Sequence, residues 1–167
     1  LGATLAFCGT VFGRKVRDEW DLRTNLYCMG IAESCSGKEH ARNQLSKICE
    51  AAGVDENILG GEDVTSEAAL EISLMSRNPV IFLWDEIGHM MKNIKANGDQ
   101  HRSSIVPTLM KLYSSANTSY RGKQYANGEQ RIIKQPCCSL YGTTVPSRLY
   151  EGMTADEIRD GWLGRCL

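Results

Sequence analysis

The sequence has few prolines and no excess of positive or negative charge. Only 4 of the 167 residues are proline, which excludes collagen-like and proline-rich disordered chains. The 19 Lys and Arg residues almost balance the 20 Asp and Glu residues, which leaves a net charge of −1. Any binding of nucleic acid must therefore come from a local basic patch and not from the overall charge.

No apolar run in the sequence is long enough to cross a membrane. The most apolar segment, residues 1–12, has about half of the ~20 residues that a membrane-spanning helix needs, and the basic residues Arg14, Lys15 and Arg17 follow it. We therefore expect a buried helix here, within a helical lead-in at residues 1–24, and no membrane partner. Because the chain begins with leucine, we also expect it to be a piece of a longer protein.

The cysteines and histidines form neither a disulfide framework nor a metal site. The chain has seven cysteines, an odd number, without C-x-x-C spacing, and its three histidines do not complete a set of metal ligands. We therefore expect reduced thiols and a cytoplasmic protein.

The rest of the composition is that of a folded domain. Hydrophobic residues make up 42% of the chain, and the sequence has no internal repeat or low-complexity tract, so we expect a single α/β domain over residues 1–167. Apolar runs predict strands, and apolar residues at helical spacing predict helices. The predicted strands cover residues 25–31, 80–84 and 137–141, the predicted helices cover 38–52, 67–76 and 102–116, another helix begins at about Ile87, and a hairpin at 120–133 turns at Ala126-Asn127-Gly128.

Local signals indicate two helix boundaries and the class of sheet. Gly53 is predicted to end the first helix, because glycine readily adopts the left-handed conformation that closes a helix. Thr65 or Ser66 is predicted to cap the second helix. The run Val80–Trp84 is apolar without alternation, which is typical of a parallel strand covered on both faces.

The loop between the first strand and the first helix has the composition of a phosphate-binding loop. Residues 32–39 read A-E-S-C-S-G-K-E, close to the pattern G-x-x-x-x-G-K-[ST], although Ala32 replaces the first glycine and Glu39 replaces the hydroxyl residue. Such a loop offers backbone amides, a lysine for the terminal phosphates and a helix N-terminus. The predicted nucleotide-binding residues are Ser34, Cys35, Ser36, Gly37, Lys38, Glu39 and His40. An ordinary strand-to-helix turn with a solvent-exposed lysine is the alternative.

Two carboxylates follow the next apolar strand. Asp85 and Glu86 come directly after Val80–Trp84, and the carboxyl ends of parallel strands meet at one edge of a sheet, beside the loop. Asp85 is predicted to hold Mg²⁺ through water, with Glu39 as a second candidate ligand, and Glu86 is predicted to deprotonate the water that attacks the γ-phosphate. The alternative is a pair of carboxylates that the dipole of the following helix favours.

These segments occur in an order that resembles one family. The order is S-G-K-E, the apolar strand with D-E, a basic hairpin, a strand leading to G-T-T-V-P and finally D-G-W-L-G-R. In this order the chain resembles the helicase-like ATPase domains of P-loop NTPases, which occur in phage, plasmid and mobile-element replication proteins, often beside a primase. The resemblance covers most of residues 25–167. It implies a three-layered P-loop NTPase core, with a mostly parallel sheet flanked by helices and an inserted β-hairpin. It also implies ATP and Mg²⁺ as ligands and the activity of a DNA helicase or primase-helicase.

The resemblance assigns roles to three residues near the C-terminus. Thr143 and Thr144, in the polar segment after the last predicted strand, would sense the γ-phosphate, with a simple turn before Pro146 as the alternative. Arg165 would act as an arginine finger on the site of a neighbouring subunit, which implies a homo-oligomeric ring such as a hexamer. Arg148 is a weaker candidate for that role, and a surface arginine is the alternative for Arg165.

The predicted hairpin is basic and carries tyrosines, a mixture suited to single-stranded or forked DNA. Its predicted DNA-binding residues are Arg121, Lys123 and Arg131, with Lys134, Tyr120 and Tyr125 nearby. A solvated charged edge that prevents sheet association is the alternative.

Two other functions fit the same motifs. A P-loop kinase or other phosphotransferase would move the phosphate to a small molecule instead of water. A non-hydrolysing nucleotide-binding assembly module would bind ATP without turnover, and Glu39 in place of the usual hydroxyl residue makes this reading reasonable.

Overall fold

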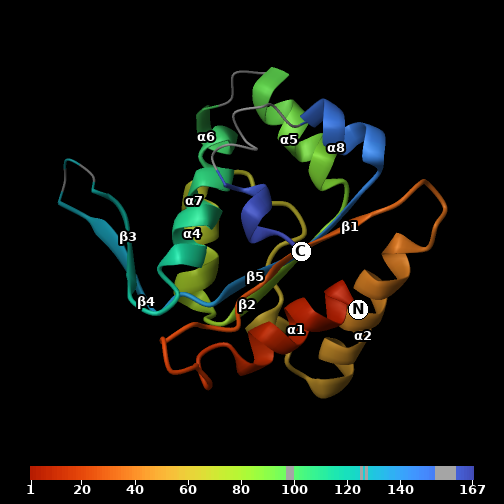
Figure 1. The fold of residues 1–167 in the computed structure, drawn as a ribbon. Helices are drawn as coiled ribbons and strands as arrows, with labels where there is room; N and C mark the ends of the chain where they lie inside the picture. Colours follow the sequence, from red (N-terminus) through yellow and green to blue (C-terminus); the bar gives the residue numbers. More distant parts are fainter. Residues whose placement is uncertain (97–99, 125, 127, 153–160) are drawn as a thin grey trace.

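The structure, a computed structural model, describes residues 1–96, 100–124, 126, 128–152 and 161–167. Its elements are α1 (Gly2–Phe12), β1 (Tyr27–Ile31), α2 (Lys38–Ala52), α3 (Asp55–Ile58), α4 (Glu67–Ser76), β2 (Val80–Trp84), α5 (Ile87–Ala96), α6 (Gln100–Ser103), α7 (Ile105–Ser114), β3 (Ser119–Gln124), β4 (Gln130–Lys134), β5 (Cys138–Thr144), α8 (Pro146–Gly152) and the 3-10 helix η1 (Leu163–Arg165) (Figure 1).

A small parallel sheet lies at the centre of the fold, with its strands in the order β1-β5-β2. The last strand in the chain, β5, therefore lies between the two earlier ones and pairs with both of them in parallel. The C-terminal residues cover the free edge of β1, where the Met29 amide donates to the Leu167 carbonyl at 2.8 Å. The fold is thus α/β with a parallel sheet flanked by helices, as predicted.

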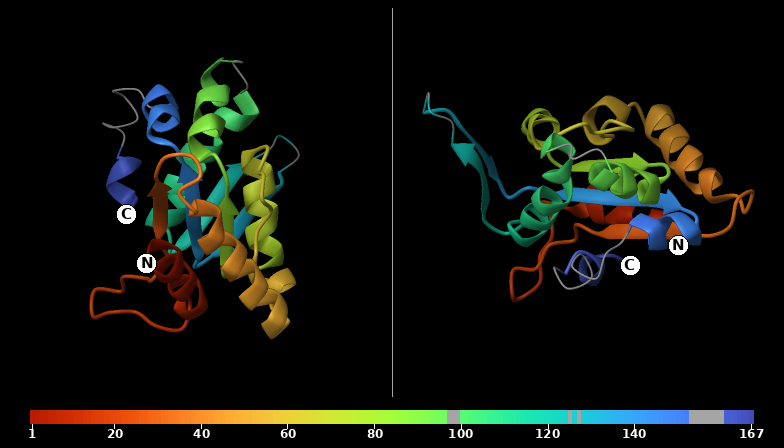
Figure 2. Two further views of the ribbon diagram at one scale, coloured as in Figure 1. Left: turned by 90° about the vertical axis from the view of Figure 1, so that its right-hand side faces the viewer. Right: turned by 90° about the horizontal axis from the view of Figure 1, so that it is seen from above.

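Helices α1 and α2 cover one face of the sheet (Figure 2). Their buried residues pack against the side chains that this face of the sheet presents. The cluster consists of Ala3, Ala6, Leu45, Cys28, Ile81, Leu83 and Tyr141. In the described part of the chain, none of the helices combines the length and the apolar character that crossing a bilayer requires.

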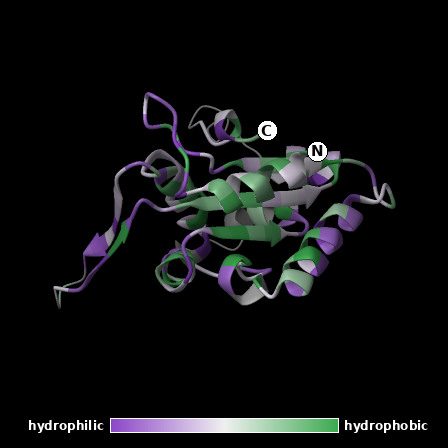
Figure 3. Cartoon of the chain, turned by 90° about the horizontal axis from the view of Figure 1, so that it is seen from below, coloured by the Kyte–Doolittle hydropathy of each residue, from purple (hydrophilic) through white to green (hydrophobic). Residues whose placement is uncertain are grey.

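Helices α4, α5 and α7 cover the other face of the sheet, so the fold has three layers (Figure 2). This larger core contains Leu70, Leu74, Phe82, Trp84, Ile87, Met91, Leu109, Leu112, Leu140 and Trp162, among others. Every residue of β2 is buried, since the strand is covered on both faces, and this explains its unbroken apolar run. Figure 3 shows a strongly hydrophobic strand in the central sheet beside paler ones.

The predicted helix boundaries at α2 and α4 are confirmed. Gly53 ends α2 in the left-handed conformation, with φ 64° and ψ 33°. Ser66 caps α4, because its side-chain oxygen accepts a hydrogen bond from the Ala69 amide at 3.3 Å.

The helix predicted at 102–116, with Pro107 either as a kink or in the first turn, is divided in the structure, and Pro107 lies in the first turn of the second part. The structure has two helices there, since α6 ends at Ser103 and α7 begins at Ile105. In one continuous helix, the Pro107 ring would collide with the carbonyl of Ser103, four residues earlier. In the first turn of α7 the proline does not break a helical hydrogen bond.

Three other parts of the prediction differ from the structure. The last strand continues to Thr144, where a polar turn was predicted, because β5 is paired on both sides nearly to its end. The lead-in at residues 1–24 is helical only in α1, which packs one face against the sheet. Helices α3 and α8 were not predicted.

The predicted hairpin is confirmed as an antiparallel pair of strands, β3 and β4, separate from the central sheet. It projects from the body of the molecule (Figures 1 and 2). Tyr125 and Asn127, which the sequence places at its turn, lie outside the described residues.

Candidate nucleotide site

The loop between β1 and α2 contains two residues in the left-handed backbone conformation. Gly37, the residue before α2, is left-handed with φ 82° and ψ 15°, and Cys35 is also left-handed with φ 62°. Left-handed residues in such a turn direct successive amides toward one side of the chain and so form a concave site for an anion. A β-carbon at position 37 would have no described atom within 4 Å. Glycine is therefore favoured at this position by the positive φ angle and not by a lack of space.

The amides of this loop are available to a ligand. Those of residues 33–39 have no hydrogen-bond partner among the described residues, and the positive end of the α2 dipole lies behind them. The Lys38 ammonium folds into the loop, where it donates to the Ala32 carbonyl at 2.6 Å and the Glu33 carbonyl at 3.4 Å. The loop therefore gathers a cation and free N–H donors in one exposed place, which is what a phosphate group requires.

The remaining predicted nucleotide-binding residues surround these donors. The side chains of Ser34, Ser36, Glu39 and His40 are exposed at the loop and the start of α2. The His40 amide already donates to the Gly37 carbonyl at 3.0 Å, so only its side chain is left for a ligand.

Asp85 lies at the same edge of the sheet as the loop. Gly142 on β5 is level with Trp84 on β2, so the next residue on each strand, Thr143 and Asp85, face each other. The Thr143 hydroxyl donates to Asp85 Oδ1 at 2.6 Å, and the Glu86 amide donates to the same oxygen at 3.0 Å. The loop follows β1, two strands away from β2, a separation of about 10 Å at the usual strand spacing.

Arg42 joins the helix after the loop to Asp85, and it was not among the predicted site residues. Its guanidinium donates to Asp85 Oδ2 at 3.0 Å. Arg42 is four residues after Lys38 on α2, so both cations lie on the same side of the helix. This four-residue spacing from Lys38 is the signal in the sequence that could have identified Arg42 as a site residue.

The contacts of Asp85 keep its carboxyl group ionised. Partial burial acts to raise the pKa of Asp85, but the hydrogen bonds from Thr143 and Arg42, the charge of Arg42 and the Glu86 amide together lower it below its ordinary value. An ionised carboxylate at neutral pH is a suitable ligand for a divalent cation.

Glu86 and Glu39 are exposed carboxylates at the same edge. Glu86 is left-handed with φ 46°, a strained conformation for a residue with a side chain. Within the described part of the chain, no group of three or more His, Cys, Asp or Glu side chains is assembled to hold a metal. A hollow of about 350 Å³ lies beside Asp85, and its wall consists of Arg42, Glu62, Asp63, Trp84, Asp85 and Met90.

Thr144 is not brought to Asp85 as Thr143 is. Successive side chains of a strand point to opposite faces, and the Thr144 hydroxyl lies under α5, where a β-carbon on Gly88 would come within 2.6 Å of it. It donates only a long bond, 3.4 Å, to the Val145 carbonyl. Arg148, on α8, is paired with Glu151 at 3.1 Å.

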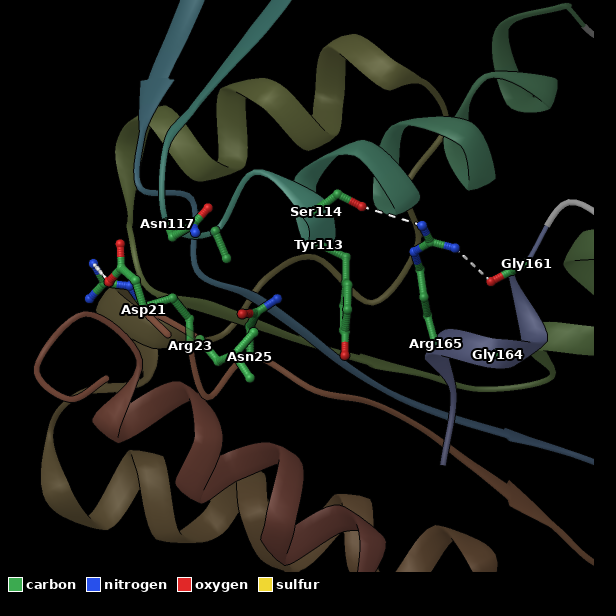
Figure 4. Close-up of a pocket in the computed structure, with 11 residues that line it drawn as sticks. Asp21, Arg23, Asn25, Tyr113, Ser114, Asn117, Gly161, Gly164 and Arg165 are labelled. Carbon is green, nitrogen blue, oxygen red and sulfur yellow. Dashed lines mark hydrogen bonds and ion pairs between the residues drawn. The ribbon is translucent and has the colours of Figure 1, made fainter. Parts of the chain in front are cut away.

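Arg165 lies at the opposite end of β1 from the loop. Its neighbour Cys166 pairs with Tyr27, the first residue of β1, whereas the loop follows the last. The guanidinium donates to the Gly161 carbonyl at 2.8 Å and to the Ser114 hydroxyl at 3.3 Å (Figure 4). Within its own chain, Arg165 is therefore not part of the cluster at the loop. Asp160, in the same motif, lies outside the described residues.

Two of the three predicted DNA-binding residues of the hairpin are held by carboxylates of α4. Lys123 pairs with Glu67 at 2.6 Å, and Arg131 pairs with the buried Glu71 at 2.7 Å. Both cations therefore already have a carboxylate partner. Arg121 is exposed and has no carboxylate partner among the described residues.

The loop, Lys38, Arg42, Asp85 and Thr143 thus form one cluster at the carboxyl edge of the sheet. Neither a protein-family model nor a curated protein matches this chain.

Proposed function

We propose that the chain binds ATP at residues 32–39 and hydrolyses it with Mg²⁺. The observation that carries this proposal is the arrangement at the carboxyl edge of the sheet. Free loop amides and the Lys38 ammonium lie at the end of β1. The ionised Asp85, which accepts a hydrogen bond from Thr143, lies at the end of β2, two strands away. Cations and amide donors on one side and a carboxylate on the other match the phosphates and the metal of a nucleotide complex.

The residues present fit a magnesium ion. Mg²⁺ prefers hard oxygen ligands and binds proteins through one or two carboxylates, while it keeps several waters and contacts the phosphates. The lowered pKa of Asp85 makes its carboxylate such a ligand, and Thr143 supplies a hydroxyl oxygen beside it. Mg²⁺, when bound, neutralises charge on the phosphates. Asp85 would hold it through water, and Glu39 would be a second carboxylate ligand.

Glu86 is the residue we assign to proton transfer. Its carboxylate would orient and deprotonate the water that attacks the γ-phosphate. The Glu86 side chain is exposed next to Asp85. Its backbone conformation is strained, and strained residues are concentrated at functional sites. Thr143 would respond to the γ-phosphate through its bond to Asp85, and Thr144 is set aside from this role by its position under α5.

The sequence resemblance supports a wider setting for this ATPase. It favours the ATPase domain of a DNA helicase or primase-helicase in the replication of phage or mobile DNA, in the cytoplasm and as a homo-oligomeric ring. Arg165, which lies away from its own loop, would then complete the site of a neighbouring subunit.

One observation favours a second candidate function, a non-hydrolysing nucleotide-binding module. The Arg42–Asp85 ion pair places a cation on the carboxylate that Mg²⁺ would need. If Arg42 stays there when ATP binds, binding without turnover follows.

The proposal is tested by nucleotide binding. Fluorescent ATP is titrated into the unaltered chain, Lys38→Ala and Lys47→Ala, where Lys47 is an exposed lysine later on α2 and serves as the matched control. We expect at least about tenfold weaker binding for Lys38→Ala alone, since one charge-assisted contact is worth roughly 1.5–3 kcal/mol. Equal binding by all three proteins would refute the site. Turnover that appears only in Arg42→Ala would favour the second candidate.

A further inference from the structure

Three adjoining cavities lie away from the loop, at the end of β1 where Arg165 is found. The central cavity, of about 460 Å³, is formed by Arg23, Asn25, Tyr113 and Arg165 among others (Figure 4). It shares Asn117 with a second cavity of about 640 Å³, and it shares Ser114 and Arg165 with a third of about 530 Å³. We call this row of cavities the basic trough, after its cations, which are Arg14, Arg23, Lys111, Arg121, Lys134 and Arg165.

The central cavity has buried donors that lack acceptors. Asn25 is 4% exposed, and its Nδ2 has no hydrogen-bond partner among the residues that the structure describes. The Arg23 side chain is 8% exposed, and its Nε also lacks a hydrogen-bond partner in the described part of the chain. Figure 4 shows the Asn25 side chain directed into the cavity between Asn117 and Tyr113. A buried donor without an acceptor costs about 1–3 kcal/mol, so this cavity favours a ligand rich in acceptor oxygens.

The charge of the trough is strongly one-sided. Among the described residues that line the three cavities, Asp21 is the only carboxylate. Its Oδ1 already accepts hydrogen bonds from Arg17 at 3.3 Å and Arg23 at 3.0 Å. The other trough cations have no carboxylate partner in the described part of the chain. In a chain with a net charge of −1, this is a concentrated positive surface.

Tyr113 adds an aromatic surface to these charges. The Arg165 guanidinium lies 6.0 Å from the centre of its ring, and the ring stands between Asn25 and Arg165 in the cavity (Figure 4). In complexes with single-stranded nucleic acid, unstacked bases stack on aromatic rings and on arginine guanidinium groups.

We propose that the basic trough binds single-stranded nucleic acid through its phosphate backbone, with a base against Tyr113. This inference rests on the proposed function for the class of partner. It deepens that function by keeping Arg121 of the hairpin in the contact and replacing Lys123 and Arg131 with the other cations of the trough. A small anion would fill one cavity, but the cations continue through all three, as a chain of phosphates requires. The hairpin cations Lys123 and Arg131, by contrast, are held by buried or nearly buried carboxylates of α4.

The test is binding of a labelled oligothymidylate by fluorescence anisotropy at several salt concentrations. Arg121→Gln and Lys111→Gln remove exposed cations from the two ends of the trough, and Lys123→Gln on the hairpin is the matched control. We expect about fivefold to tenfold weaker binding for each trough variant and a salt slope smaller by about 0.7, the value for one lost phosphate contact on a single strand. The control should bind within about twofold of the unaltered chain.

Other outcomes overturn the inference. Normal binding by both trough variants, or a larger loss in Lys123→Gln, would place the contact at Lys123 and Arg131 and not in the trough. Binding of inorganic phosphate without binding of the oligonucleotide would mean a small-anion site only. ATP binding is measured on the same proteins and should be unchanged in Arg121→Gln and Lys111→Gln. Oligonucleotide binding by a chain that does not bind ATP would refute the proposed function and leave the trough supported.

Discussion

Replacing Thr143 with valine should destabilise the fold by removing the bond that fixes Asp85. Valine has almost the same shape as threonine and favours strands, so β5 should stay intact. What is lost is the 2.6 Å hydrogen bond from the Thr143 hydroxyl to Asp85 Oδ1. Hydrogen bonds to charged groups contribute about 1.5–3 kcal/mol to stability. The Asp85 side chain is 42% exposed, so water replaces part of the bond, and we expect a loss near the lower value, about 1.5 kcal/mol.

The effect should depend on pH in a defined direction. The pKa of Asp85 is lowered in the folded state, despite partial burial, by Thr143, by Arg42 and by the Glu86 amide. The stability that this carboxylate contributes is therefore fully present above its unfolded pKa, about 4, and is lost as the pH falls through its folded pKa. In Thr143→Val the pKa of Asp85 should rise toward its ordinary value. The difference in stability between the two proteins should thus be largest near neutral pH and shrink in acid.

Urea unfolding followed by circular dichroism at pH 7 and at pH 3 measures this difference. Thr144→Val is the matched control, because Thr144 is equally buried, lies next in the same strand and makes only a 3.4 Å bond to a backbone carbonyl. It should cost less than about 1 kcal/mol and show little pH dependence. Equal effects of the two substitutions at both pH values would refute the role assigned to Thr143.

Three smaller predictions follow from packing and burial. Gly88→Ala should lower the free energy of unfolding by about 1–2 kcal/mol, measured in urea, because a β-carbon would come within 3.0 Å of the Arg148 backbone and crowding outweighs the better helix propensity of alanine. Gly53→Ala should lower it by about 1 kcal/mol, since alanine is strained at φ 64°. In iodoacetamide labelling at pH 8, the exposed Cys35 should react and Cys137 should not, because burial raises the pKa of Cys137 to about 12 against the opposing charges of nearby arginines.

The parts of the fold that depend on local chemistry could be predicted from the sequence. The boundaries of α2 and α4 follow from Gly53 and from the Ser66 cap, and both signals act within a few residues. The burial of β2 follows from its unbroken apolar run. The turn before α2 could be predicted because Gly37 and Lys38 are adjacent at the start of the helix.

The parts that depend on tertiary contacts could not be predicted. Thr143 and Thr144 look like a turn in the sequence, yet they continue β5 because this strand is paired on both sides nearly to its end. Arg42 is one of many charged residues on a helix, and only the sheet order brings Asp85 within its reach. The same holds for Lys123, whose carboxylate partner lies more than fifty residues earlier on α4.

The central claim is most directly tested by release of phosphate from ATP and Mg²⁺, with and without single-stranded DNA. The unaltered chain, Lys38→Ala and Glu86→Gln are measured in parallel. We predict turnover that DNA stimulates and that both substitutions abolish, with ATP binding weakened in Lys38→Ala and retained in Glu86→Gln. Turnover and ATP binding that are unchanged in Lys38→Ala would contradict the assignment of residues 32–39 as the phosphate-binding loop.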